Sequence, residues 1–154
     1  MDLKITEHFT FNEMTNTSHK DLLPQNRAEG VGSLQNICAV CSELEKVRAF
    51  TAKPIRITSG FRCKALNDRV GGAETSDHLD GSAADFVPVG FKDPHGLRAI
   101  FDWCLENVDF SEIVYECPTG RKPWIHLARP KVGKVKEVWV WNGKSYEAPG
   151  AKTS

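Results

Sequence analysis

Two histidines and an aspartate are the residues of this chain whose types are best suited to metal chemistry. His78 and Asp85 lie seven residues apart in TSDHLDGSAAD, residues 75–85, and His126 follows in WIHLAR. Together they offer two imidazole nitrogens and one carboxylate oxygen. A catalytic zinc site needs three such protein ligands and an open fourth position for water. The three residues are therefore candidate ligands of a single zinc ion.

The same residues allow a second interpretation. A lone histidine is more often a hydrogen-bonded structural residue than a ligand, and Asp85 could bond a nearby backbone amide. The four residues before Asp85, GSAA, are small, which lets the backbone approach closely and leaves room beside the carboxylate. Residue spacing alone therefore leaves both a metal site and a structural role open.

Length, charge and hydropathy narrow the class of protein. At 154 residues the chain is long enough for one domain, which we expect over residues 1–147, followed by a flexible tail at 148–154. The 20 basic and 20 acidic residues balance, which argues against a nucleic-acid partner. No apolar run approaches the roughly 20 residues that span a bilayer, and the start lacks the apolar core of a signal peptide. We therefore expect synthesis in the cytoplasm without a signal peptide, with any export using another route.

The cysteines indicate a reducing compartment, because their number is odd and their spacing irregular. Cys38 and Cys41 form a CxxC that could be redox-active or half of a zinc clip. The surrounding residues read as an amphipathic helix and no second CxxC follows, so core packing is the favoured interpretation. A redox role would require a thiol of depressed pKa. The five cysteines are Cys38, Cys41, Cys63, Cys104 and Cys117.

Helices are predicted from their caps and apolar spacing. Thr10 and Glu13 have the spacing of a capping box, and Ser33 is predicted to cap a longer amphipathic helix. Residues 19–32, which include a proline and two glycines, read as a surface loop. Further helices are predicted at residues 64–70 and from Asp93 to about Val108.

Strands are predicted at residues 54–58, 82–89, 112–116 and 124–128. Segments 135–141 and 144–148 are joined by Asn142-Gly143, the strongest short hairpin signal. Helices that precede and separate strands able to form hairpins indicate an α+β fold. We expect an antiparallel sheet covered on one face by helices.

A longer pattern carries a resemblance to a known family. The motif S-x-H-x-x-G-x-A-x-D runs from Ser76 to Asp85, follows SGFR at residues 59–62 and precedes W-x-H at residues 124–126. It resembles the zinc D-Ala-D-Ala carboxypeptidase family, which shares its fold with hedgehog signalling domains. The likeness spans roughly His8 to Trp141, and HFTFNEM and KPIRITSGFRCKALNDRVGG resemble the phage and prophage branch. The resemblance implies a hedgehog/DD-peptidase-like fold, Zn²⁺ bound by His78, Asp85 and His126, and peptidoglycan peptides as substrate.

The resemblance also implies catalytic roles. The family places a glutamate near its second histidine, but Lys122 and Pro123 precede Trp124-Ile125-His126 here. The hedgehog-like branch carries its glutamate upstream in a Tyr-Glu pair, and Tyr115-Glu116 resembles that pair. Glu116 is therefore our candidate for general base and acid. Glu112 is the alternative.

Three further residues resemble substrate-binding positions of the family. Arg62, in SGFR, matches the arginine that binds substrate or stabilises charge near the reacting carbonyl. Ser76 would orient the ligand loop or contact substrate, and Trp124 would wall the cleft. Ser76 and Trp124 could equally be structural support, and without the motif Arg62 would be interpreted as an exposed charge at a turn.

Two functions therefore follow from the sequence. The first is a monomeric zinc metallopeptidase of D,D-carboxypeptidase or endopeptidase type, acting in phage or prophage lysis or carried in a virion. The second is a non-catalytic, zinc-containing binding or virion structural module on the same fold.

Overall fold

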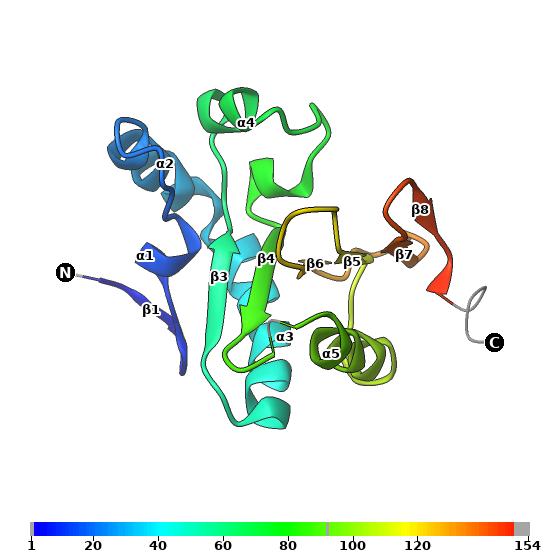
Figure 1. Ribbon diagram of the computed structural model, residues 1–154. Helices are drawn as coiled ribbons and strands as arrows, with labels where there is room; N and C mark the ends of the chain where they lie inside the picture. Colours follow the sequence, from blue (N-terminus) through cyan, green and yellow to red (C-terminus); the bar gives the residue numbers. More distant parts are fainter. Residues whose placement is uncertain (1, 92, 150–154) are drawn as a thin grey trace.

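A mixed β-sheet with helices packed against it dominates the computed structural model, which describes residues 2–91 and 93–149 (Figure 1). The α+β class predicted from the sequence is confirmed. The tail predicted at 148–154 lies outside the described residues from position 150 onwards. No helix in the described part of the chain is both long enough and apolar enough to cross a bilayer. In spatial order the six strands of the sheet are β3 (Ile55–Ser59), β4 (Ala83–Pro88), β6 (Trp124–Ala128), β5 (Glu112–Glu116), β7 (Glu137–Trp141) and β8 (Tyr146–Glu147).

The prediction of a purely antiparallel sheet is wrong at one pair of strands. β5 and β7 run parallel, whereas the other pairs in this sheet are antiparallel. Strand β6 already has β4 on one edge and β5 on the other, so the chain that leaves β6 cannot pair with it again. It turns back and adds β7 beyond β5. The predicted hairpin at Asn142-Gly143 is confirmed as the β7–β8 connection.

The helices lie where the sequence places them, with one exception. The capping box of Thr10 and Glu13 is confirmed, and Asp93 accepts a hydrogen bond from Gly96 N at 2.8 Å at the start of the last helix. Ser33 stands at the start of the longest helix as predicted, but the predicted cap is wrong, because its side chain makes no capping hydrogen bond. In Figure 1 this helix, α3, passes behind β3 and β4. The α-helices are α1 (Phe11–Met14), α2 (Leu23–Gly30), α3 (Leu34–Thr51), α4 (Lys64–Val70) and α5 (Pro94–Asn107).

Helix α2 corrects the prediction of a surface loop at residues 19–32. Pro24 sits in its first turn, where a missing N–H costs nothing, so this proline is compatible with a helix start. The helix has no apolar face, because its buried residues are Asn26 and Gly30. The Asn26 amide donates to the carbonyls of Thr15 and Phe61 and accepts from Cys63 N. Helix α2 is thus held by a buried polar contact that apolar periodicity does not reveal.

Side-chain alternation gives the sheet two different faces. On β4, β5 and β6 one set of residues is buried against α3 and α5, which supply apolar side chains to the same core. The alternate set points to the opposite, open face and carries the polar residues. The buried set comprises Ala84, Phe86, Ile113, Tyr115, Ile125 and Leu127, and the open set includes Asp85, Val87, Glu112, Glu116, Trp124 and His126.

The CxxC lies within α3, and the core-packing interpretation holds for Cys41 but not for Cys38. Cys41 is fully buried, Cys38 is exposed, and both are free thiols. Burial raises the pKa of the Cys41 thiol, the opposite of what a reactive cysteine requires.

Candidate metal centre

The three predicted ligands meet on the open face of the sheet. Asp85 and His126 are directly opposite each other on the paired strands β4 and β6, and their Oδ1 and Nδ1 atoms are 2.9 Å apart. His78 approaches from the short 3-10 helix η2 (Asp77–Asp80), with Nε2 3.3 Å from the same Asp85 oxygen. One ligand atom from each residue lies within 4.8 Å of the others. The sequence motif thus brings together three residues that could hold one metal ion.

His78 is fixed by the backbone around it. Its Nδ1 lies 2.7 Å from the carbonyl oxygen of Gly60, which can only accept, so Nδ1 carries the proton and Nε2 is free to bind a metal. Arg62 N donates to the His78 carbonyl at 2.9 Å, and Ser76 Oγ accepts from His78 N at 3.2 Å. Ser76 therefore caps η2 and orients the ligand segment. Gly81 ends the turn at φ +78°, where a Cβ would come within 2.9 Å of Ser33 Cβ.

The second imidazole is oriented by a carboxylate that the sequence motif does not include. His126 Nε2 lies 3.2 Å from Glu112 Oε1, on the opposite side of the ring from the nitrogen that faces Asp85. A proton on Nε2 that bonds Glu112 leaves Nδ1 as the ligand atom, and outer carboxylates fix metal-binding histidines in this way. Asp77 also comes close to Glu112 and His126, but its carboxylate is 2.6 Å from Lys131 Nζ.

The electrostatics of the site couple Asp85 to the two histidines. Burial alone would raise the pKa of Asp85, but its interactions with His78 and His126 outweigh that effect and hold the pKa far below its usual range. Burial would lower the pKa of His126, but its hydrogen bonds to Asp85 and Glu112 raise it to about 10. Without a metal, Asp85 and His126 form an ion pair at neutral pH.

The arrangement fits zinc. In a tetrahedral site with bonds of about 2.0 Å, neighbouring ligand atoms lie roughly 3.3 Å apart. The distances from Asp85 Oδ1 to His78 Nε2 and to His126 Nδ1 are 3.3 and 2.9 Å, which is close to that spacing before any ion is placed. Two nitrogens and one oxygen are also a known ligand set for catalytic zinc.

Glu116 stands beside this centre on the same face as Glu112, four residues further along β5. It lines a recess with His126, and Tyr146 donates a hydrogen bond to its Oε1 at 2.8 Å. Burial raises the pKa of Glu116, and the bond from Tyr146 partly offsets that effect. Sequence reasoning missed Tyr146, which comes from β8 and has no motif to mark it.

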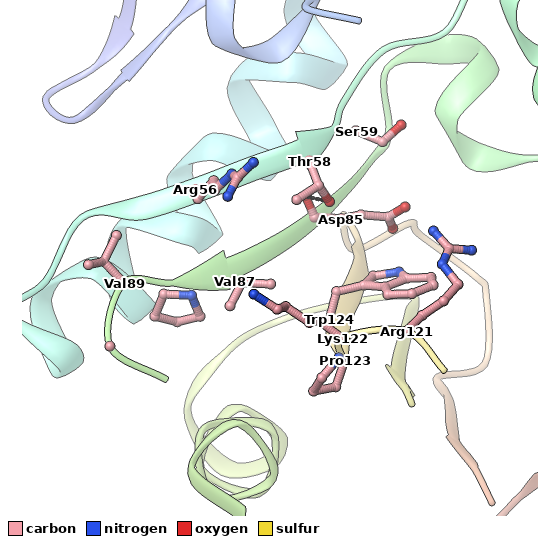
Figure 2. A pocket seen from close by; sticks show the side chains of 12 residues that line it. Arg56, Thr58, Ser59, Asp85, Val87, Val89, Arg121, Lys122, Pro123 and Trp124 are labelled. Carbon is pink, nitrogen blue, oxygen red and sulfur yellow. Dashed lines mark hydrogen bonds between the residues drawn. The ribbon is translucent and has the colours of Figure 1, made fainter. Parts of the chain in front are cut away.

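Arg62 and Trp124 both line the cleft at the candidate metal centre. Arg62 lines it together with His78, Asp85 and Glu116. Its buried Nε has no hydrogen-bond partner among the described residues, and the charge of Asp85 acts on its guanidinium. Figure 2 shows Trp124 beside Asp85, with Arg121 next to the indole.

Comparison with protein families agrees with this arrangement. A family model described as Peptidase M15 matches residues 7–128, most of the chain. The matched segment contains the three candidate ligands together with Arg62 and Glu116, whereas Tyr146 and strands β7 and β8 lie beyond it. A search of curated proteins found no match.

Proposed function

The chain belongs to the peptidase M15 family, whose members are zinc-dependent peptidases, and from this premise we propose that it hydrolyses peptide bonds in bacterial peptidoglycan. The bond would lie in a stem peptide or a cross-link, cut by D,D-carboxypeptidase or endopeptidase action. The observation that carries the proposal is the meeting of His78, Asp85 and His126 on an open sheet face that also presents Glu116 and Arg62.

The metal would be held by His78 Nε2, an Asp85 oxygen and His126 Nδ1. A zinc ion held there would supply a water activated at neutral pH, with a pKa of about 7, and would polarise a carbonyl oxygen. Gly60 and Glu112 keep the two imidazoles in the tautomers that this requires.

Glu116 is the proposed general base and acid. It takes a proton from the attacking water and passes it to the leaving amine, so it must be ionised at the start of each turnover. The hydrogen bond from Tyr146 favours that ionised form. Glu112 is less suited to this role because its carboxylate is engaged with His126 Nε2, on the ring edge that faces away from Asp85.

Arg62 is the proposed substrate-binding cation. A guanidinium can donate paired hydrogen bonds to a carboxylate or to the charge that develops on the attacked carbonyl. Its buried, unpartnered Nε and its place beside His78 support this role. Trp124 walls the same cleft, where it can pack against the peptide.

The test compares Glu116→Gln with wild type and with Glu106→Gln, a matched change at an exposed carboxylate of α5. All three proteins should contain stoichiometric zinc by mass spectrometry. We expect digestion of purified peptidoglycan to fall by roughly 100-fold or more in Glu116→Gln alone, the scale of lost acid-base catalysis. Wild-type protein that holds zinc yet cleaves nothing would instead support a non-catalytic binding or virion structural module. Stoichiometric zinc in His126→Ala would refute the ligand set.

We also propose that the enzyme belongs to the phage or prophage branch and serves in lysis or in a virion. The resemblance of HFTFNEM and of residues 53–72 to that branch supports this part of the proposal. Expression in a bacterial cytoplasm should then lyse cells only when a holin is co-expressed. Lysis that requires no holin, or no lysis with one, would argue against it.

A further inference from the structure

A second hollow lies on the open face of the sheet, next to the candidate metal centre. It has a volume of about 480 Å³ and is bounded by β3, by β4 and by the loop that leads into β6. Figure 2 shows Arg56 and Thr58 on β3, Asp85 and Val87 on β4, and Arg121, Lys122 and Trp124 opposite them. We call it the β3 groove.

The β3 groove is positively charged. It is lined by the three cations Arg56, Arg121 and Lys122, and Asp85 is the one acidic residue among the described residues that line it. The Asp85 charge is already engaged by two histidines. None of the three cations makes an ion pair within the described ranges, and Arg121 lies over the Trp124 ring, 5.0 Å from its centroid. The groove therefore holds positive charge that the protein itself does not neutralise.

The opposite side of the metal centre has a different balance of charge. There the cleft is lined by acidic residues as well as by Arg62, Arg121 and Lys134. Charge thus changes along the open face, from mixed and acid-rich on the β5 side to basic on the β3 side. The acidic residues of that side are Asp77, Glu112, Glu116 and Glu137.

The two hollows join at the metal centre. Asp85, Arg121 and Trp124 line both the cleft and the β3 groove. A peptide that lies across the proposed metal could therefore continue into the groove, where its side chains or its end would meet Arg56 and Lys122.

We propose that the β3 groove is a subsite for a carboxylate of the substrate peptide. This inference rests on the proposed function and adds a chemical requirement to it, namely a negative charge on one side of the scissile bond. Arginine suits this task because its planar guanidinium can bond both oxygens of a carboxylate, and lysine adds a point charge. The carboxylate comes either from an acidic residue within the peptide or from the peptide's C-terminus.

Four synthetic pentapeptides separate these sources. Each has the sequence L-Ala-γ-D-Glu-L-Lys-D-Ala-D-Ala, with the glutamate α-carboxyl and the C-terminal carboxyl each present as free acid or as carboxamide. The groove variant is Arg56→Gln/Lys122→Gln. Neither side chain lines the cleft at the metal centre, so the proposed catalytic residues are left in place. The matched control is Lys4→Gln/Lys20→Gln, which removes the same charge from exposed positions outside the groove.

We expect wild type and the control to cleave the peptide that carries the recognised carboxylate about tenfold more efficiently, in kcat/KM, than its carboxamide counterpart. The groove variant should lose that preference and cleave both alike. The acid and carboxamide pair that shows the preference identifies whether the recognised carboxylate is that of glutamate or that of the C-terminus. Equal cleavage of all four peptides by wild type, or a preference that survives in the groove variant, overturns the proposal.

Binding of the same peptides to zinc-loaded Glu116→Gln protein, with and without the groove substitutions, keeps this test independent of turnover. If wild type cleaves nothing but binding discriminates acid from amide through Arg56 and Lys122, the subsite stands and the proposed function fails. If wild type cleaves the peptides but neither measurement distinguishes acid from amide, the proposed function stands and the subsite fails. Absence of both cleavage and discrimination overturns both.

Discussion

The raised pKa of His126 should make zinc binding strongly dependent on pH. In the metal-free protein the hydrogen bonds to Asp85 and Glu112 raise that pKa to about 10, so His126 is protonated at neutral pH. A metal can take Nδ1 only when the ring gives up a proton, and binding therefore releases that proton to solvent.

The magnitude follows from the pKa. At any pH below about 10 one proton must be displaced from His126, and each pH unit changes the cost by about 1.4 kcal/mol. Between pH 6 and pH 8 the apparent association constant for zinc should therefore rise about a hundredfold, or roughly 2.7 kcal/mol. Asp85 adds nothing to this slope, because its lowered pKa keeps it ionised throughout the range.

The assay is competition against a chelator whose own pH dependence is known, combined with calorimetry in two buffers of different ionisation enthalpy to count released protons. Glu112→Gln provides the comparison. It removes one of the two carboxylates that raise the His126 pKa, so its affinity should level off at lower pH. A wild-type affinity that is flat from pH 6 to pH 8, with no proton release, would refute the proposed link between His126, Asp85 and Glu112.

Three other outcomes follow from the structure. The metal-free protein should lose stability as pH rises from about 6.5 toward about 10, because the His126 pKa is raised in the folded state. It should also lose stability as pH falls below about 4, because the Asp85 pKa is lowered. Thermal unfolding in the presence of a chelator measures both effects, and constant stability from pH 6 to pH 10 would contradict the first. Tyr146→Phe should shift the acid limb of the kcat/KM profile to higher pH, since the lost bond is one that lowers the Glu116 pKa; an unmoved limb would separate Tyr146 from catalysis. Gly81→Ala should destabilise the fold by about 2–3 kcal/mol in denaturant titrations, more than the roughly 1 kcal/mol expected for Gly133→Ala, because both glycines have positive φ but only Gly81 is crowded. Equal losses would show that Gly81 is not tightly packed.

Local patterns in the sequence were sufficient for most of the secondary structure. The capping box at Thr10, the Asp93 cap and the Asn142-Gly143 hairpin each depend on neighbours within a few residues, and each is present. Helix α2 was missed because its stability depends on Asn26, whose partners lie 11 to 37 residues away. The parallel pairing of β5 and β7 was missed for a similar reason, since it depends on which edges other strands have already taken.

The same contrast between local patterns and long-range contacts applies to the candidate metal centre. Spacing alone left the roles of His78, Asp85 and His126 open, and the resemblance to a known family named them as ligands. The structure brings the three together. The contact of Tyr146 with Glu116 and the position of the β3 groove beside the metal centre could not be predicted, because both depend on pairings between distant strands.

The strict alternation of side chains on β4, β5 and β6 ties the chemistry to the integrity of the fold. A slip of β6 by one residue would turn Ile125 and Leu127 outward to water and His126 inward to hydrocarbon in the same step. Misfolded molecules of this kind would be inactive and, because they expose apolar side chains, prone to aggregation. Loss of hydrolysis and the onset of aggregation should therefore appear together when this chain ages, is heated or acquires insertions in its central strands.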